Sequence, residues 1–255
     1  MAMALNPRIE GWKERRVWVI GASTGIGRAT AIALLQRGAQ VAVSARSAPE
    51  LQSIHGALPL PLDVTDADAV QAAMQGLLRD WGGLDLLLYC AGTYRPMRAT
   101  AFDLATALRH DDVNYRGALH ALAAALPVFN AQRAGHIALV SSVAGFGGLP
   151  QALAYGPTKA ALINLAETLY IDLHPQGIGV HVINPGFVET PLTAQNTFAM
   201  PALIPPEQAA DALIGGLEAG RFDVHFPRRF TLWLKLLRLL PRGLYFRIVS
   251  RFTGL

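Results

Sequence analysis

The sequence is poor in the features that mark secreted, metal-binding and membrane-spanning proteins. Among 255 residues there is one cysteine, Cys90, which excludes an internal disulfide framework and fits a reducing compartment. The seven histidines are scattered with no His/Cys cluster, so we expect no metal site. Residues 1–16 lack the apolar core of a signal peptide. No uninterrupted apolar run reaches the ~18 residues of a membrane-spanning helix. We therefore expect a cytoplasmic protein.

Acidic side chains are absent after Asp223, whereas seven of the 22 basic residues follow it. The rest of the chain has 15 basic residues against 18 acidic ones, so the body is mildly acidic and the end is basic. A nucleic-acid-binding protein usually spreads its basic surface over the fold. Here the charge is confined to one leucine-rich segment, and we expect no nucleic-acid partner.

Short apolar runs alternate with longer segments of helical pattern. With 52% apolar and 16% charged residues the chain can bury a large core. The predicted strands are Arg16–Ile20, Val41–Ala45, Leu58–Leu62, Leu84–Cys90, His136–Ser141, Gly179–Asn184 and Asp223–Phe226. The predicted helices are Ile26–Arg37, Asp66–Trp81, Phe102–Gln132, Ala152–Leu173 and Pro206–Ala219. This alternation predicts an α/β fold, a single-domain, doubly wound parallel sheet of Rossmann type over residues 1–228, followed by a tail at 229–255.

A glycine-rich turn joins the first predicted strand to the first predicted helix. Its residues are Gly21, Ala22, Ser23, Thr24, Gly25, Ile26 and Gly27. Glycine lets a pyrophosphate approach the main chain closely, and the helix N-terminus offers free N–H groups and a positive dipole end. The position of the turn, between a strand and a helix in the first βαβ unit, predicts a dinucleotide site.

The end of the second strand bears on which dinucleotide binds. An NAD enzyme commonly has a carboxylate here for the ribose 2′-hydroxyl, but Ala45 occupies the position and Arg46 follows. A guanidinium can form a two-pronged, charge-assisted pair with a 2′-phosphate. Arg46 can also be explained as a solvated charge at a strand end. The missing carboxylate favours NADP(H), with NAD(H) as the second choice.

A tyrosine and a lysine lie four residues apart at the start of a predicted helix. Tyr155 and Lys159 therefore share one helical face, and a nearby ammonium lowers the pKa of a phenol. Ser142 ends a predicted strand at the carboxyl edge of the sheet, where open α/β sheets bind ligands. Asn114 lies in the long helix after the fourth strand. A further segment, Asn184–Thr190, follows the sixth strand and can close over a nicotinamide.

The glycine spacing G-x-x-x-G-x-G and the Tyr-x-x-x-Lys pair resemble those of the short-chain dehydrogenase/reductase family, over about residues 14–226. The resemblance implies hydride transfer between nicotinamide and a carbonyl or alcohol carbon. Tyr155 would be the proton donor, Lys159 would hold the nicotinamide ribose, and Ser142, preferred to Ser141, would bond the substrate oxygen. Asn114 would hold a water of a proton relay. The family's cofactor contacts map onto Gly21, Ser23, Thr24, Gly25, Ile26, Gly27, Arg46, Asp63, Ala91, Gly92, Tyr155, Lys159, Pro185, Gly186, Val188 and Thr190.

Asp63 resembles the family aspartate beside the adenine, although a turn or capping carboxylate explains it equally. Three positions depart from the family. Tyr89-Cys90-Ala91-Gly92 replaces the usual Asn-Asn-Ala-Gly, Ile20 replaces a threonine before the glycine turn, and Pro157 stands inside the Tyr-to-Lys turn. A proline in the first turn of a helix removes only an N–H that lacks a partner. None of the three removes a catalytic group.

Residues 187–206 are expected to form an apolar substrate lid, which suits a lipophilic carbonyl or alcohol. Packing against the body or another subunit explains the same residues. In the tail, a narrow stripe of basic residues borders leucine-rich faces, and this pattern predicts an amphipathic helix. Such a helix either packs internally, which we favour, or lies in a membrane interface.

Two other functions remain open from the sequence. A catalytically silent dinucleotide-binding sensor predicts the loss of the tyrosine, lysine or serine, and all three are present. A lipid-surface scaffold predicts membrane binding by the tail without turnover. The resemblance also implies a homodimer or homotetramer.

Overall fold

The computed structural model of the protein describes residues 4–196 and 198–253. The parts of the expected body, lid and tail at residues 1–3, 197 and 254–255 lie outside the described residues. Seven parallel strands form one sheet in the order β3-β2-β1-β4-β5-β6-β7. The strands are β1 (Arg16–Ile20), β2 (Gln40–Ser44), β3 (Leu58–Pro59), β4 (Leu86–Tyr89), β5 (His136–Val140), β6 (Gly179–Pro185) and β7 (Asp223–Phe226). The expected Rossmann-type sheet is confirmed.

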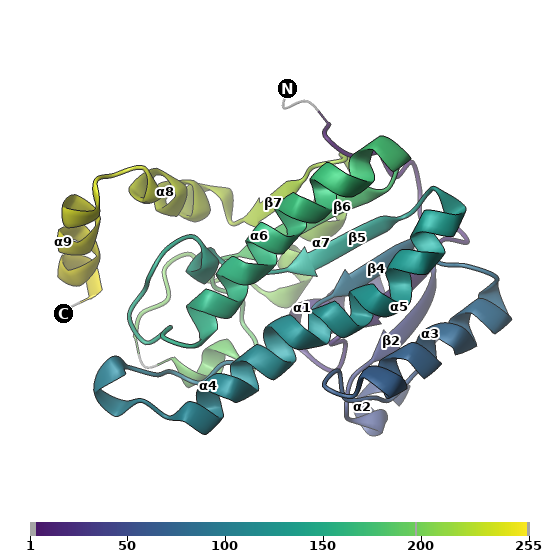
Figure 1. The fold of residues 1–255 in the computed structure, drawn as a ribbon, viewed down its shortest axis with the longest axis horizontal. Helices are drawn as coiled ribbons and strands as arrows, with labels where there is room; N and C mark the ends of the chain where they lie inside the picture. Colours follow the sequence, from purple (N-terminus) through teal and green to yellow (C-terminus); the bar gives the residue numbers. More distant parts are fainter. Residues whose placement is uncertain (1–3, 197, 254–255) are drawn as a thin grey trace.

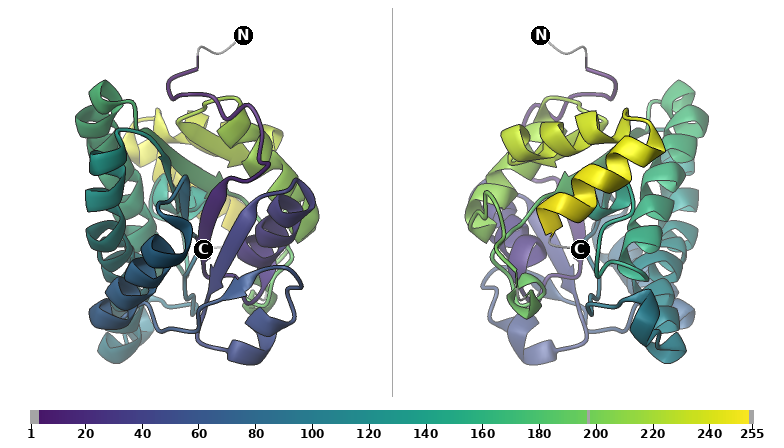
Figure 2. Two further views of the ribbon diagram at one scale, coloured as in Figure 1. Left: turned by 90° about the vertical axis from the view of Figure 1, so that its right-hand side faces the viewer. Right: turned by 90° about the vertical axis from the view of Figure 1, so that its left-hand side faces the viewer.

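Helices cover both faces of this sheet (Figure 1). The helices are α1 (Gly25–Gln36), α2 (Ala48–Gln52), α3 (Ala67–Trp81), α4 (Leu104–Asp111), α5 (Gly117–Gln132), α6 (Tyr155–Leu173), α7 (Pro206–Glu218), α8 (Arg228–Arg238) and α9 (Arg242–Thr253). Short helical turns are η1 (Ala99–Ala101), η2 (Asp112–Arg116), η3 (Val143–Gly145), η4 (His174–Gln176) and η5 (Thr193–Gln195). The two helical layers stand on either side of the sheet in Figure 2.

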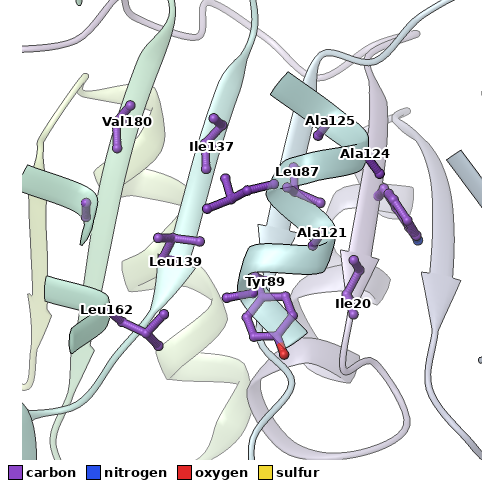
Figure 3. Packing of buried hydrophobic residues seen from close by; sticks show 14 of the residues in the cluster. Ile20, Leu87, Tyr89, Ala121, Ala124, Ala125, Ile137, Leu139, Leu162 and Val180 are labelled. Atoms are coloured by element: carbon purple, nitrogen blue, oxygen red, sulfur yellow. The ribbon is translucent and has the colours of Figure 1, made fainter. Parts of the chain in front are cut away.

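Each face of the sheet has its own core because the strands are apolar on both sides. One cluster packs strand residues such as Ile20, Leu87 and Leu139 against α3, α5 and α6 (Figure 3). The other packs Val19 and Leu88, among others, against α1 and α7. Because all strand pairs are parallel, the carboxyl ends of the strands lie along one edge of the sheet.

Several predicted boundaries are wrong. The helix expected at 102–132 is split, because five residues, Asp112–Arg116, form a π-helical segment between α4 and α5. Helix α6 begins at Tyr155 and not at Ala152, which instead forms an isolated bridge with Met97. Strand β3 has two residues in place of five, and α2 was not predicted. In contrast, Asp66 caps α3 as expected by accepting a hydrogen bond from the N–H of Ala69.

A buried pair of histidines connects the amino ends of β5 and β6. Nδ1 of His136 lies 3.1 Å from Nε2 of His181, whose Nδ1 lies 2.6 Å from the carbonyl oxygen of Arg221. If His181 donates to that carbonyl, its Nε2 accepts the proton of His136, so both rings are neutral. Burial lowers the pKa of His136 to about 4 and that of His181 to about 3.

These lowered values predict a loss of stability in mild acid. The ordinary histidine pKa is 6.5, so below that pH the unfolded chain binds protons that the folded chain excludes. At pH 5 each histidine should cost on the order of 2 kcal/mol of unfolding free energy relative to pH 7.5. Urea unfolding at the two pH values measures the difference. His136→Gln should reduce the difference in unfolding free energy between the two pH values, whereas His55→Gln, at an exposed histidine, should leave it unchanged. An unchanged difference in His136→Gln would exclude this histidine pair as the cause.

Candidate active site

The carboxyl ends of the strands border a single large cavity of about 1310 Å³. The loops after β1 to β6 line it on the sheet side, and α8 and α9 line it on the opposite side. Of the residues predicted from sequence, the lining includes Gly21, Ser23, Thr24, Gly25, Ile26, Arg46, Asp63, Ala91, Gly92, Ser142, Tyr155, Lys159, Pro185, Gly186, Val188 and Thr190. Gly27 and Asn114 lie behind this lining, where each supports a neighbour.

Gly21 and Gly27 are required by the close approach of backbone segments. Gly21 has φ +95°, and a Cβ there would lie 2.4 Å from the backbone nitrogen of Ala91. A Cβ at Gly27 would lie 2.2 Å from the carbonyl oxygen of Gly21. Larger side chains would therefore separate α1 from the turn and the turn from β4. The N-terminus of α1 lies at the cavity, and free N–H groups at a helix N-terminus suit a phosphate.

The segment after β6 packs against the same turn. A Cβ at Gly25 would lie 2.7 Å from Cγ2 of Thr190, so Thr190 contacts the glycine turn directly. Its backbone N–H is held by the hydroxyl of Thr193, which donates to the carbonyl of Val188 at 2.5 Å. The expected nicotinamide-side segment and the pyrophosphate-side turn thus form one continuous wall.

The two charged residues predicted for the adenosine end both line the cavity. Arg46 is exposed at the end of β2, and among the described residues no carboxylate pairs with it. Asp63 accepts hydrogen bonds from the N–H and the hydroxyl of Thr65 and lies 3.5 Å from Arg109. Burial opposes ionisation, but the bonds from Thr65 and Arg109 outweigh it and lower the pKa of Asp63. Asp63 is therefore a turn carboxylate that also borders the cavity.

Tyr155, Lys159 and Ser142 converge where β5 meets α6. Nζ of Lys159 donates to the carbonyl of Val140 at 2.9 Å and lies 5.5 Å from the centre of the Tyr155 ring. Ser142 begins η3 and accepts from the N–H of Ala144, with its hydroxyl at the cavity. The hydroxyl of Ser141 is buried and donates to the backbone carbonyl of Lys159 at 2.7 Å. This bond engages Ser141 in holding α6, and it favours Ser142 as the residue that faces a substrate.

Burial dominates the acid–base properties of this group. It raises the pKa of Tyr155 above its ordinary value, and a hydrogen bond with Ser142 offsets the rise only in part. Burial lowers the pKa of Lys159 to about 8. The expected lowering of the Tyr155 pKa is not seen, because desolvation of the phenol raises this pKa. The phenol is therefore protonated at neutral pH.

Asn114 sits in the π-helical segment η2 and is completely buried. Its Oδ1 accepts from the N–H of Thr93 at 2.7 Å, and its Nδ2 donates to the carbonyl of Thr93 and to the hydroxyl of Thr158. The side chain therefore ties the loop after β4 to α6. These bonds use both hydrogens of Nδ2, so the side chain could hold a water of a proton relay only through the second lone pair of Oδ1.

Tyr89, one of the departures in sequence, explains how η2 is held. Its hydroxyl donates to the carbonyl of Val113 at 2.5 Å. A Cβ at Gly117 would lie 2.4 Å from the same hydroxyl oxygen. π-Helical turns often occur at functional sites because one extra residue re-aims a side chain. Here the tyrosine supplies from β4 the support that the replaced amide side chains do not.

Sequence reasoning missed several residues that shape the cavity. Tyr94 packs edge-on against Tyr155 with ring centres 5.0 Å apart, and its carbonyl accepts from Gln195 of the lid. His110 is buried and accepts at Nε2 from the N–H of Arg95, which holds the same loop. These residues belong to no motif. The only signal available was that their loop follows β4 at the ligand-binding edge.

The tail proved to be part of the cavity. Its residues at the lining are Phe230, Trp233, Leu234, Leu237, Ile248, Val249 and Phe252. Lys235 pairs with Asp223, and the hydroxyl of Tyr245 donates to the carbonyl of Gly148 at 2.8 Å. The lid residue Phe187 contacts both Phe198 and Phe230. The tail and the lid thus share one apolar wall, although much of the tail's other face is exposed. No helix among the described residues is long and apolar enough to span a membrane.

The chain is similar in sequence to known dehydrogenases and oxidoreductases. Residues 15–200 match the family model of short chain dehydrogenases. A protein of Myxococcus xanthus, named an uncharacterized oxidoreductase, is 36% identical over 91% of this chain and 94% of its own length. One of Staphylococcus epidermidis with the same description is 32% identical over 80% of this chain and 91% of its own.

Solved structures share the fold. A ribose-5-phosphate isomerase of Brucella melitensis superposes with a TM-score of 0.77 and 27% identity, over 84% of this chain and 92% of that one. The protein gox2181 superposes with a TM-score of 0.79 over 90% of this chain and 98% of that one, and at 22% identity it shows the fold alone.

Proposed function

This chain belongs to the short-chain dehydrogenase/reductase family of oxidoreductases, and from that premise we propose that it uses NADP(H) to interconvert a lipophilic carbonyl compound and its alcohol. The observation that carries the proposal is the convergence of Tyr155, Ser142 and Lys159 on a cavity whose other end has the glycine turn and Arg46. Nothing in this arrangement favours carrying over the isomerase activity of the Brucella protein.

The residues present fit a nicotinamide dinucleotide, the cofactor class of the family. The glycine turn leaves backbone open where a Cβ would collide, which suits a pyrophosphate. Arg46, with no carboxylate beside it on β2, suits a 2′-phosphate. Gly21 to Gly27, Asp63, Ala91, Gly92 and the segment Pro185–Thr190 would hold the cofactor, which supplies or accepts the hydride when it is bound. NAD(H) is the alternative.

The chain's own groups handle the proton. In reduction, Tyr155 donates its phenolic proton to the oxygen that becomes the alcohol, and the raised pKa keeps that proton available at neutral pH. Ser142 donates a hydrogen bond to the same oxygen. Nζ of Lys159, 5.5 Å from the centre of the Tyr155 ring, brings a positive charge close to the tyrosine, and Lys159 would also hold the nicotinamide ribose. Asn114 keeps α6 and the loop after β4 in register.

The apolar end of the cavity supports the lipophilic substrate. The wall opposite the catalytic group is formed by the lid and the tail, in which aromatic and aliphatic side chains predominate. Each methylene that a substrate buries against such a wall contributes about 0.8 kcal/mol to the binding free energy, or about fourfold in affinity. A silent sensor or a pure scaffold would need neither this wall nor the three catalytic side chains.

Oxidation of NADPH with linear aldehydes, methyl ketones and 3-oxoacyl thioesters of four to twelve carbons tests the proposal. We expect kcat/KM to rise at least tenfold from the shortest to the longest compound of the active class, because added methylenes enter the apolar part of the cavity. The proposal fails if no compound is turned over with either dinucleotide. A flat dependence on chain length would retain the oxidoreductase and reject the lipophilic substrate.

A further inference from the structure

The tail helices α8 and α9 have two apolar faces, and only one of them is used by the cavity. Phe230, Leu234 and Leu237 of α8 line the cavity, as do Ile248 and Val249 of α9. A second set of apolar side chains is exposed and does not line it. This outward set is Leu232, Leu236, Leu239, Leu244 and Phe246. The tail is therefore a thin layer between the cavity and the surroundings of the protein.

The cavity opens beside this outward set. Trp233 and Phe252 both line the cavity and are exposed to solvent. One belongs to α8 and the other to α9, so the cavity reaches solvent at both tail helices. Figure 1 shows α8 and α9 beyond the carboxyl ends of the strands, and in the right-hand view of Figure 2 they cross in front of the sheet, between the two helical layers.

The charge around the outward set has one sign. Arg228, Arg229, Arg238, Arg242, Arg247 and Arg251 are all exposed, and none of them has an ion pair among the described residues. The only tail cation paired with a carboxylate there is Lys235, which bonds Asp223. Unpaired arginines that border exposed leucine and aromatic side chains are the features of a helix lying in an anionic membrane interface.

We propose that the outward face of α8 and α9 binds an anionic lipid surface, so that the side of the cavity lined by the tail lies next to the bilayer. A second copy of this chain is the competing occupant. In a two-fold interface the same surface meets itself, and residues 224–255 contain no acidic side chain. Tail against tail would therefore set arginine against arginine. Anionic lipid complements both the charge and the apolar side chains.

Lipid binding by the tail goes beyond the proposed function and does not depend on it. Only the entry of a lipophilic substrate from the bilayer rests on that function. The two are separable because vesicle binding is measured without turnover. Turnover of a short, water-soluble carbonyl compound is measured without vesicles.

The test is cosedimentation of the full chain with vesicles of 30% phosphatidylglycerol in phosphatidylcholine, with pure phosphatidylcholine as the comparison. We expect binding to the anionic vesicles alone, weakened at least tenfold between 50 and 500 mM salt as the arginines are screened. Absence of binding to the anionic vesicles, or equal binding to both kinds, would overturn the proposal.

A pair of double variants separates the outward face from general surface hydrophobicity. Leu236→Gln with Leu239→Gln removes side chains that are 57% and 80% exposed, whereas Leu104→Gln with Ile171→Gln removes side chains 60% and 70% exposed on α4 and α6. We expect the first pair to lose at least tenfold in vesicle affinity and the second to lose none. Both should keep the thermal midpoint of the unmodified chain.

Sedimentation equilibrium of the same variants tests the competing occupant. If the tail pair dissociates an oligomer, and the unmodified chain does not bind vesicles, a second copy covers this face and the proposal is wrong. An equal loss of vesicle binding in the tail pair and the α4–α6 pair would also overturn it, because vesicle binding would then not be specific to the tail.

Discussion

Tyr155→Phe is expected to lower kcat by about 10³-fold, within the range that general acid–base catalysis usually contributes. The substitution removes only the phenolic hydroxyl and leaves the ring, which packs edge-on against Tyr94. NADPH affinity should therefore change less than threefold. Stopped-flow turnover and titration of NADPH fluorescence measure the two quantities separately.

The matched control is Tyr94→Phe, which removes a phenolic hydroxyl from the same cavity and keeps the ring. The hydroxyl of Tyr94 has no part in the proposed proton transfer, so this variant should retain most of its turnover. If Tyr155→Phe keeps more than a tenth of the unmodified activity, Tyr155 is not the acid. If Tyr94→Phe loses as much as Tyr155→Phe, the loss is not specific to the Tyr155 hydroxyl, and Tyr155 is not identified as the acid.

The pH dependence of the reaction follows from the same burial. Because desolvation raises the pKa of Tyr155, its protonated form persists through neutral pH, and this is the form that the proposed reduction would consume. An oxidised nicotinamide would add positive charge and favour the Tyr155 phenolate that alcohol oxidation would need. The proposed reduction thus needs the protonated form of Tyr155, and the reverse oxidation needs its phenolate.

The sheet and the glycine turn were predictable because their residues obey local rules. Buried parallel strands appear in the sequence as continuous apolar runs, and Gly27 is required by a close contact with Gly21 within one βαβ unit. Tyr155 and Lys159 were predictable because helical spacing sets them on one face. Ser142 strengthened the prediction of these two residues, because the parallel topology brings it to the same edge of the sheet.

The remaining features depend on contacts between distant segments. The π-helical segment around Asn114 exists because Tyr89, Thr93 and Thr158 bond it from other elements, and a helical periodicity carries no sign of this. The two-sided role of α8 was also hidden. Leu236 and Leu237 are adjacent in sequence, yet one is exposed and the other is buried against the cavity. Only the packing of the tail decides which leucine faces inward.

Arg46→Ala is expected to weaken NADPH binding by about 100-fold and to leave NADH binding within twofold. Two charge-assisted hydrogen bonds to a 2′-phosphate together contribute about 3 kcal/mol at the lower end of their range, which corresponds to about 100-fold. The guanidinium is exposed at the end of β2 and has no ion pair among the described residues. Its removal should therefore leave the fold intact. Calorimetric titration with each dinucleotide measures the change.

Arg98→Ala is the matched control, since Arg98 is an exposed arginine on the lining of the same cavity but far along the chain from β2. It removes the same charge, so a general electrostatic effect on NADPH would appear in both variants, and a specific one in Arg46→Ala alone. The reciprocal change, Ala45→Asp, adds the carboxylate that repels a 2′-phosphate and accepts from a ribose 2′-hydroxyl. It should shift preference toward NADH. If Arg46→Ala weakens both dinucleotides equally, Arg46 supports the fold and the proposed preference for NADP(H) is wrong, whatever Ala45→Asp does.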